Sequence, residues 1–590
     1  MKTKIGGQAV LEGVMMRGAT SMALAVRDEM GNIRMDTTRL ATKKPWYRKV
    51  PFLRGIVNLV VSLKDGSKTI GKSASVMVEE VDTKGSSMGW MMTISMLLGV
   101  VLALALFVLL PTYIGKGIFA LAKLDPTALE WAWLKSLIEG VAKMLILIGY
   151  MVGISQMKEI KRVFMYHGAE HKTIACYEAE LPLTVENVQQ CSRYHDRCGT
   201  SFLVFVVVLS IVLMMVLDVV CAAVNFTLFL DKWWLRALLK IALLPLTAGI
   251  SYEVLMLLAR TNFVLVRPLK WLGKQFQKLT TREPSDDMCE VAIAAFNKVL
   301  EMDADITVEE VHFPDPIPLS EFRTLVLKSE LIKYVKGDID WLLTSMLNIK
   351  SEDLSKDIKI PYGWTLRVEH MVQRINNGEP WQYVIGKTMF YNRTFVVNKD
   401  VLIPRQETEL VTEQVIKQLD KCESVLDLCC GSGAIGITVE REISKMNIAP
   451  VGVTCADVSK DALKVAKQNA KLNNSQVKLV QSDMFDNVNG TFDVIVCNPP
   501  YIESDVIDTL DVSVKDYEPR LALDGGEDGL KYYRILAEQA HLYLSEGGLL
   551  VLEIGYNQGE KVKALLQERY GVQVIKDYSD NDRIVIARLK

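Results

Sequence analysis

The sequence predicts a multidomain protein: an α-helical membrane domain with about four spans, then a small helical bundle, then a seven-stranded, Rossmann-like α/β domain. Three observations predict this. The chain has 590 residues, more than one ordinary domain needs. Its long apolar segments all lie before residue 265. After residue 380, short β-rich runs alternate with helical segments, which is typical of a mostly parallel, doubly wound sheet.

Composition narrows the class of protein. Half of the residues are hydrophobic and the mean hydropathy is +0.18, too apolar for a wholly soluble protein. The net charge of −2 and the pI near 6.4 give no global sign of a nucleic-acid binder. The ten cysteines are scattered, so we interpret them as reduced thiols and not as a disulfide framework. The N-terminus lacks the apolar stretch of a signal peptide.

Four apolar segments are each long enough to cross a bilayer. They cover about 89–114, 134–157, 201–229 and 234–258. The second carries Glu139 and Lys143 four residues apart, so it either faces protein or lies shallow. Basic residues follow the second and fourth segments: Lys158, Lys161, Arg162, Lys172, Arg193, Arg197, Arg260, Arg267, Lys270 and Lys274. With a basic N-terminal region, this predicts a bacterial membrane protein whose N-terminus, central loop and C-terminal part are all cytoplasmic.

The rest of the chain divides by pattern. We expect a membrane domain over 1–300, an extended, Pro-rich linker over 301–318, a helical bundle over 319–385 and the α/β domain over 386–590. Strands are predicted at 424–428, 451–456, 477–481, 492–497 and 548–554, with a closing pair near 571–576 and 583–588.

Polar or glycine residues follow four of these strands, and parallel strands place their carboxyl ends at one edge of a sheet. Asp427 ends the first strand, and Gly431 and Gly433 follow it where the backbone can approach a ligand closely. Asp457 follows the second strand, suitably for ribose hydroxyls, and Asp483 follows the third, suitably for an adenine amino group. Taken singly, these two aspartates could instead be helix N-caps, and the glycines only a tight turn. A dinucleotide fingerprint would need a third glycine, which disfavours a nicotinamide enzyme.

Asn498 follows the fourth strand and begins Asn-Pro-Pro-Tyr. An amide or exocyclic amine nitrogen is a poor nucleophile because its lone pair is delocalised, so a catalyst must hold the NH2 group with acceptors. The Asn498 oxygen can accept one N–H and a carbonyl beside Pro499 and Pro500 the other, while the prolines fix that carbonyl's direction. Tyr501 offers a flat face for a planar group. The motif therefore indicates methyl transfer to a planar nitrogen, which gains mainly from positioning.

With three further motifs, residues 319–590 resemble the protein-(glutamine-N5) methyltransferases that modify peptide chain release factors. The motifs are Glu-Pro-Trp-Gln-Tyr at 379–383, Val-Leu-Ile-Pro-Arg-Gln-Glu-Thr-Glu at 401–409 and Tyr-Glu-Pro-Arg-Leu-Ala-Leu-Asp-Gly-Gly at 517–526. The resemblance implies a class I methyltransferase fold, with 319–385 as a substrate-binding domain. It also implies S-adenosylmethionine as methyl donor and the glutamine of a Gly-Gly-Gln loop as acceptor.

The resemblance assigns residues by position. It implies that Cys429, Cys430, Gly431, Ser432, Gly433, Asp457, Asp483, Met484 and Asn498 contact the cofactor. It implies that Asn498, Pro499, Pro500 and Tyr501 are catalytic and hold the glutamine amide.

Two positions depart from the family. The family usually has Gly-Thr where this chain has Cys429-Cys430, and Pro where Gln406 stands. Cys429 therefore requires an ordinary backbone conformation or lowers cofactor affinity. A metal pair at the two cysteines is disfavoured because no other Cys or His ligand lies nearby in sequence.

Four further residues near these motifs are expected to support the site without taking part in the reaction. Glu407 and Glu409 are expected at the rim or in a structural role, because the amide proton can leave to water after transfer. Arg405 is expected on the same cleft wall, and Cys497 is expected as a small buried strand residue.

The membrane half contains three of the six histidines in one loop. His167 and His171 belong to His-x-x-Glu-His, which on a helix places both imidazoles on one face as zinc ligands require. We predict a cytoplasmic-face metal site, zinc for preference, using His167 and His171 with two of His195, Cys198 and Cys191. Alternatively, the histidines bind loop backbone or lipid phosphate. The segments that contain these histidines and cysteines, together with residues 6–18, resemble a family of uncharacterised bacterial multi-pass membrane proteins. The resemblance covers about 1–300, and members of that family have been suggested to be metal-dependent.

We therefore expect a membrane-tethered enzyme that methylates release factors on glutamine, with release factors and the bilayer as partners and no direct nucleic-acid binding. An adenine N6-methyltransferase is an alternative, but the 319–380 helices show no concentration of Lys and Arg. A non-catalytic membrane scaffold is the other alternative. It is disfavoured by the presence of Asp427, Gly431, Gly433, Asp457 and the Asn-Pro-Pro-Tyr residues.

Overall fold

The computed structural model describes residues 3, 5–41, 50–77, 81, 87–125, 128–195, 198–224, 233–260, 267–335, 338–418, 422–446 and 451–590. The chain forms two compact units, one of Met1–Phe322 with Glu352–Arg367 and the other of Arg323–Ser351 with Val368–Lys590. The division runs through the expected helical bundle (319–385) and not in front of it. Basic residues Lys43, Lys44, Arg48, Lys49 and Arg197, which entered the topology prediction, lie outside the described residues.

The first unit contains a four-stranded antiparallel sheet that the sequence reading missed. Its strands are β1 (Gly6–Val10), β2 (Gly13–Arg17), β3 (Ser21–Arg27) and β4 (Ile33–Arg39), in that order. The N-terminal part is therefore not helical throughout: a β-sheet accompanies the helices that were expected there. Strands β2 and β3 are buried on both faces, so their sequences lack the alternation that predicts a strand.

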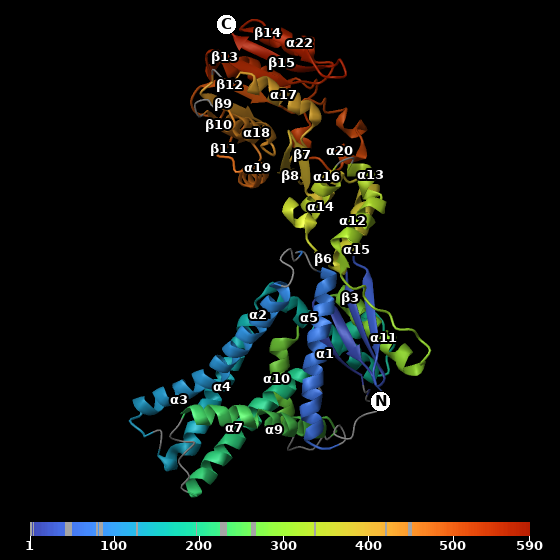
Figure 1. Cartoon of the computed structure of the whole chain (residues 1–590), viewed down its shortest axis with the longest axis vertical. Helices are drawn as coiled ribbons and strands as arrows, with labels where there is room; N and C mark the ends of the chain where they lie inside the picture. The colour runs from blue at the N-terminus through green and yellow to red at the C-terminus, as the bar shows by residue number, and fades with distance from the viewer. Residues whose placement is uncertain are drawn as a thin grey trace. The chain divides into compact units, whose positions relative to one another are not determined.

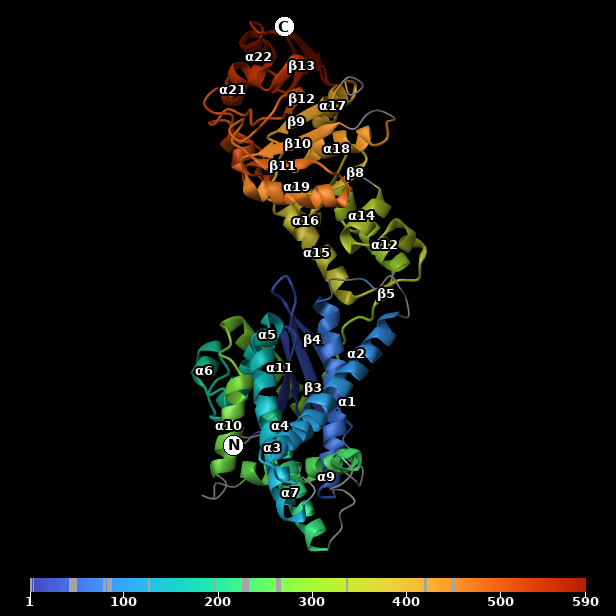
Figure 2. The same ribbon diagram turned by 90° about the vertical axis from the view of Figure 1, so that its left-hand side faces the viewer.

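Two helices cover one face of this sheet. Helices α5 (Lys158–Glu178) and α11 (Asp286–Ala304) lie beside it (Figure 2) and share a buried core with Val14, Met16 and Ala23. The short helix α6 (Val185–Gln190) adds Val188 to the same core. Residues far apart in sequence therefore meet around this sheet.

Three stretches of helix are long and apolar enough to cross a membrane: Leu97–Leu121, Trp133–Ile154 and Val204–Cys221. They belong to α2 (Ser87–Leu104) with η2 (Ala105–Leu109) and α3 (Leu110–Leu121), to α4 (Ala132–Ile154) and to α7 (Gly199–Ala223). The fourth predicted span coincides with α9 (Trp233–Arg260), whose apolar stretch Ile241–Val254 is shorter. Residues 225–229 of the third predicted span lie outside the described residues, and the count of four stays a prediction.

Two further helices, α1 (Leu53–Met77) and α10 (Arg267–Thr280), complete the helices of the N-terminal part (Figure 1). Residues 305–316 after α11 have neither helix nor strand, in agreement with an extended segment. That segment is bound to the sheet, since Val311 O accepts from Thr37 N and Val311 N donates to the Thr37 hydroxyl at 2.7 Å. It continues into β5 (Ile317–Pro318), which pairs with β6 (Lys359–Ile360).

The helical part after the linker consists of short helices: α12 (Leu319–Lys328), α13 (Leu331–Val335), α14 (Ile339–Leu347), α15 (Tyr362–Asn376) and α16 (Trp381–Ile385). A hairpin of β7 (Lys387–Phe390) and β8 (Arg393–Val396) follows.

The second unit contains a seven-stranded sheet in the order β11-β10-β9-β12-β13-β15-β14. The strands are β9 (Ser424–Leu428), β10 (Gly452–Asp457), β11 (Lys478–Gln481), β12 (Phe492–Cys497), β13 (Leu544–Glu553), β14 (Tyr570–Lys576) and β15 (Asp582–Leu589). The first five are parallel, and β15 runs antiparallel to both of its neighbours. This confirms the predicted seven-stranded, mostly parallel sheet.

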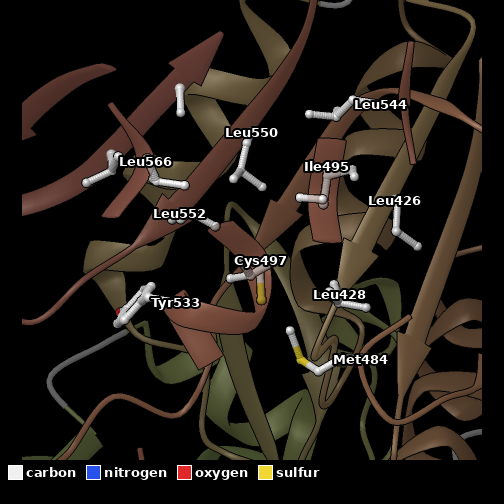
Figure 3. Close-up of a cluster of buried hydrophobic side chains, with 14 of the residues drawn as sticks. Leu426, Leu428, Met484, Ile495, Cys497, Tyr533, Leu544, Leu550, Leu552 and Leu566 are labelled. Atoms are coloured by element: carbon white, nitrogen blue, oxygen red, sulfur yellow. The ribbon is translucent and has the colours of Figure 1, made fainter. Parts of the chain in front are cut away.

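Helices cover both faces of this sheet. Val411 of α17 (Gln406–Ile416) and Val439 of α18 (Ala434–Ile443) share a core with Val425 and Val494 on one face. Leu536 of α21 (Lys531–Gln539) and Leu566 of α22 (Gly559–Leu566) share another core on the opposite face with Leu426, Ile495 and Leu550 (Figure 3). Helices α19 (Lys460–Leu472) and α20 (Val512–Lys515) complete the unit. Strand residues alternate between the two cores, which fixes the strand register and hence the edge where the strands end.

Candidate functional site

A pocket lies at the carboxyl ends of β9, β10, β11 and β12. The loop after each of these strands contributes lining residues, and so does the segment before α17. Of the predicted site residues, Cys429, Cys430, Gly431, Ser432, Asp457, Asp483, Met484, Asn498 and Pro500 line the pocket. Gly433, Pro499 and Tyr501 are not among the lining residues but adjoin them in sequence.

The turn after β9 depends on left-handed backbone. Cys429, Gly431 and Gly433 have φ of 58°, 53° and 76°. Glycine adopts this region without strain, whereas an L-residue with a Cβ does so at a cost. Cys429 therefore does not have the ordinary conformation that would make the departure from the family's glycine harmless.

Asp457 orders this turn. Its carboxylate accepts hydrogen bonds from Gly431 N and Ser459 N, both at 2.8 Å. Burial raises the pKa of the Asp457 carboxyl. Ser459, and not Asp457, caps α19, because the Ser459 hydroxyl accepts from Ala462 N at 3.1 Å. Asp457 thus faces the pocket while holding the glycine turn in place.

Asp483 and Asp427 occupy contrasting environments. The Asp483 side chain is exposed at the pocket and has no hydrogen-bond or ion-pair partner among the described residues. Asp427 is fully buried and accepts from Gly436 N at 2.8 Å; burial raises its pKa to about 7. Asp483 is free to meet a ligand, whereas Asp427 anchors the start of α18.

The Asn498 amide is oriented by residues that sequence reasoning did not select. Its Nδ2 donates to the Thr408 hydroxyl at 3.4 Å, and Thr408 donates to Glu553 Oε2 at 2.7 Å. The Tyr501 hydroxyl donates to the other Glu553 oxygen at 3.4 Å. Because the Asn498 nitrogen is engaged, its oxygen is the atom left to accept from a ligand in the pocket.

Glu553 is the buried end of this network. It ends β13, is 1% exposed, and burial raises its pKa to about 7. Thr408 lies in the quoted motif at 401–409, but nothing in the sequence links either residue to Asn498. Only the pairing of β12 with β13 and the packing of α17 bring them together.

Two glycines, Gly525 and Gly529, pack against the backbone of the Asn-Pro-Pro-Tyr segment. A Cβ on Gly525 would lie 2.8 Å from Tyr501 Cα, and one on Gly529 would lie 2.5 Å from Tyr501 O. The Gln558 amide also donates to Tyr501 O at 3.0 Å. Gly525 of the 517–526 motif and Gly529 just beyond it are therefore required for close backbone packing against Asn-Pro-Pro-Tyr.

The same motif meets the 401–409 segment. Arg405 forms an ion pair with Glu518, which is 5% exposed and also accepts from Ile403 N at 3.3 Å. Arg405 lines the pocket, as predicted for the cleft wall. Glu409 accepts from Tyr391 N at 2.8 Å, which is a structural contact with the β7–β8 hairpin. Glu518 is a further residue that sequence reasoning missed.

A separate cluster lies in the first unit. The ligand atoms of His167, His171 and Cys198 all lie within 4.8 Å of one another. The fourth predicted ligand, His195, is directed to Glu178, with Nε2 3.5 Å from Oε2. Cys191 lies within hydrogen-bonding reach of Cys176, and both are free cysteines. The structure thus brings together three of the four residues assigned to a metal.

The fold and the pocket define an α/β methyltransferase of the class with a seven-stranded sheet. Residues 396–514 match the family described as methyltransferase small domain, and residues 50–302 match the family described as protein of unknown function (DUF1385).

Three relatives extend these matches. A release factor glutamine methyltransferase of Fusobacterium nucleatum is 34% identical over 54% of this chain and 83% of the relative. One of Streptococcus pneumoniae is 40% identical over 37% of this chain and 78% of the relative. The uncharacterized protein YqhQ of Bacillus subtilis is 35% identical over 51% of this chain and 93% of the relative.

The chain therefore belongs to two families at once, the release factor glutamine methyltransferases through its C-terminal part and the DUF1385 family through its N-terminal part. Both predicted resemblances are confirmed, and so is the prediction of an S-adenosylmethionine-dependent enzyme.

Proposed function

We propose that the C-terminal unit transfers a methyl group from S-adenosylmethionine to the side-chain nitrogen of the glutamine in the Gly-Gly-Gln motif of peptide chain release factors. The observation that carries this is the Thr408–Asn498 hydrogen bond, which leaves the Asn498 oxygen as acceptor at the pocket. The names of the C-terminal relatives support the same substrate class.

The residues at the strand ends fit the donor. The left-handed turn at 429–433 lets the backbone approach it closely, Asp457 faces the ribose position, and Asp483 accepts from the adenine amino group. When bound, S-adenosylmethionine supplies an electrophilic methyl group on a sulfonium. Cys429, Met484 and Asn498 complete the wall.

Asn498 and the diproline corner act on the acceptor. The Asn498 oxygen accepts one amide N–H and a carbonyl of the Pro499-Pro500 segment accepts the other, so the amide plane and its lone pair are fixed. Tyr501, held by Glu553, supports the planar group. The nitrogen bonds to the methyl carbon as the carbon–sulfur bond breaks, and the excess proton leaves to water. These residues contribute by positioning.

The test uses the purified full chain in detergent, with labelled S-adenosylmethionine and a release factor. Asn498→Ala is expected to abolish transfer while binding of S-adenosylmethionine, measured by calorimetry, stays largely intact. Asn489→Ala, at an exposed asparagine, is the matched control and should transfer normally. Undiminished transfer by Asn498→Ala would defeat the assignment.

The same assay separates the alternatives. Methyl transfer to a DNA duplex with none to protein would identify an adenine N6-methyltransferase instead. Failure of the wild-type chain to bind S-adenosylmethionine would identify a scaffold.

We also propose that the N-terminal unit is a multi-pass membrane domain of the cell membrane with four spans, which holds the methyltransferase on the cytoplasmic side. Three apolar helices and the apolar stretch of α9 support it.

For the N-terminal unit we propose zinc binding by His167, His171 and Cys198. Both imidazoles have Nδ1 at a backbone carbonyl: His167 at Thr280 O (2.9 Å) and His171 at Arg193 O (2.7 Å). This places the proton on Nδ1 and leaves Nε2 of each ring as a ligand, the usual arrangement of metal-binding histidines. We expect about one zinc per purified chain by elemental analysis, and its loss in His171→Ala but not in His312→Ala. An equal zinc content in all three proteins would contradict the site.

A further inference from the structure

A cavity of about 450 Å³ lies between the apolar helices of the N-terminal unit, and neither methyl transfer nor the zinc site uses it. It is bounded by α2 with η2 and α3, by α4, by α7 and by α9. Its volume falls within the range of about 300–1,000 Å³ that small-molecule sites occupy. Most of its wall is apolar, with Phe107, Leu147 and Val207 as examples. The cavity is therefore suited to part of an amphipathic molecule.

Two of the helices around the cavity have an irregular backbone where they line it. The π-helical turn η2 contributes Phe107, and Pro111 lines the cavity at the start of α3. In α9, Pro245 lies between the lining residues Leu243 and Thr247. π-helical turns are frequent at functional sites, and irregular backbone at membrane depth is tolerated where it is buried or lines a cavity. Both irregularities therefore mark this cavity as a candidate binding site.

One acid and one base of α4 line the cavity. Glu139, which is 4% exposed, and Lys143 both belong to its wall. Lys143 Nζ donates to Ser210 Oγ of α7 at 3.5 Å. A Cβ on Gly115 of α3 would lie 3.0 Å from Glu139 Cγ, so α3 packs closely against the acid. Ionisable side chains inside a span are costly, and they commonly mark a functional site.

Both charges lie deep within the proposed second span. Glu139 and Lys143 follow Trp133, where the apolar stretch Trp133–Ile154 begins, by six and ten residues. At a rise of 1.5 Å per residue these are distances of about 9 and 15 Å along the helix. Since the hydrocarbon core is about 30 Å thick, Lys143 lies near its middle. A lipid that only surrounds the protein keeps its headgroup at the surface, so a headgroup at this depth requires matching charges.

We propose that the cavity binds the headgroup of an aminophospholipid, with the ammonium at Glu139 and the phosphate at Lys143. This rests on the proposed membrane placement of the N-terminal unit. A headgroup with a single charge would leave either the acid or the base unmatched away from water, whereas a zwitterionic headgroup matches both. Val100 and Leu104 line the cavity and are 50% and 36% exposed, so it opens sideways, where acyl chains lie.

The experiment uses the full chain, purified in detergent and stripped of lipid. Native mass spectrometry follows its titration with phosphatidylethanolamine or with phosphatidylglycerol of the same acyl chains, which is anionic and lacks the ammonium. We expect one phosphatidylethanolamine per chain, bound about tenfold or more tightly than phosphatidylglycerol. Glu139→Gln should weaken its binding about tenfold or more, because a hydrogen bond between charged groups is lost. Glu130→Gln, at an exposed glutamate just before α4, is the matched control and should bind like the wild type.

A second variant tests the cavity without changing a charge. Ala103 is exposed and lines the cavity, so Ala103→Phe should fold and should lower the affinity for phosphatidylethanolamine, even if Glu139→Gln does not fold. Wild-type affinity in both variants would show that only surrounding lipid is bound and would overturn the proposal. Equal or tighter binding of phosphatidylglycerol by the wild type would overturn the zwitterionic headgroup. The membrane placement fails separately, if a phosphatase inserted after Asp125 shows no activity outside the membrane.

Discussion

Thr408 connects the Asn-Pro-Pro-Tyr motif to a buried carboxylate. Its hydroxyl accepts from Asn498 Nδ2 and donates to Glu553. Thr408→Val keeps the shape but removes both bonds. We expect kcat for methyl transfer to fall about fivefold, because a hydrogen bond worth about 1 kcal/mol then no longer orients the amide. KM for S-adenosylmethionine should stay within about twofold.

The conservative variant Thr408→Ser should recover most of the rate, since it restores the hydroxyl. A rate for Thr408→Val equal to that of the wild type, in the same labelled-methyl assay, would show that Asn498 is oriented by something else.

The left-handed backbone of Cys429, with φ of 58°, strains the folded state. Cys429→Gly removes this strain, of about 1–2 kcal/mol, but adds freedom to the unfolded chain. We expect a net gain in unfolding free energy of about 0.5–1 kcal/mol and tighter binding of S-adenosylmethionine.

Cys430→Gly is the matched control. Cys430 is buried and is not among the residues with positive φ, so glycine there should lower stability. Thermal unfolding and calorimetry check both variants. A lower melting temperature for Cys429→Gly would contradict the strain argument.

The roles of site residues that lie in or next to a recognisable motif could be predicted from the sequence. The roles of residues whose partners lie far away in the sequence could not. Asp457, Asp483 and Asn498 lie directly after strands, so their convergence at one edge follows from parallel pairing. Glu518 and Glu553 are 113 and 145 residues from their partners Arg405 and Thr408. Their roles depend on burial and on tertiary packing, for which a single sequence carries no signal.

At the scale of elements, the end of β13 makes stability depend on pH. Burial raises the pKa of Glu553 from 4.5 to about 7, so the folded chain keeps a proton that the unfolded chain releases between these values. The free energy of unfolding therefore falls as pH rises from 4.5 to 7 and levels off above that. At 1.36 kcal/mol per pH unit the effect is about 3 kcal/mol.

Glu553→Gln should reduce the slope of this dependence, measured as melting temperature of the full chain between pH 4.5 and 8, while buried Asp427, whose pKa is also raised to about 7, keeps the rest of it. Glu546→Gln, on the exposed part of the same strand, should keep the wild-type slope. Parallel slopes for all three proteins would contradict a raised pKa at Glu553.

The two sheets show which elements a sequence reveals. Strands β9 and β12 begin and end where predicted, because turns and charged residues bound their apolar runs. Strands β2 and β3 were not predicted, because Val14, Met15 and Met16 are all buried. A layer of helices covers one face of these strands, and residues of α1 and α15 cover the other. Without alternation, a short apolar run resembles any other buried segment.

At the scale of the whole molecule, the topology is open to a direct test. We expect a phosphatase that is active only on the outer side of the membrane to be active when inserted after Asp125, between the first two spans. Insertions after Glu180 and Asp305 should be inactive, since both sites are expected in the cytoplasm. Activity at Asp305 would mean an odd number of spans and would contradict the proposed placement of the methyltransferase.

The boundary between the compact units bears on how the chain can be cut by proteases and how its gene can recombine. The chain leaves the first unit after Phe322, returns for Glu352–Arg367 and leaves again. Within that returning segment, Leu366 belongs to the same buried cluster as Val10 and Val76. A single proteolytic nick therefore cannot release an undamaged enzyme, and an exchange of genes at one breakpoint cannot swap either part cleanly. We therefore expect the two parts to be inherited together.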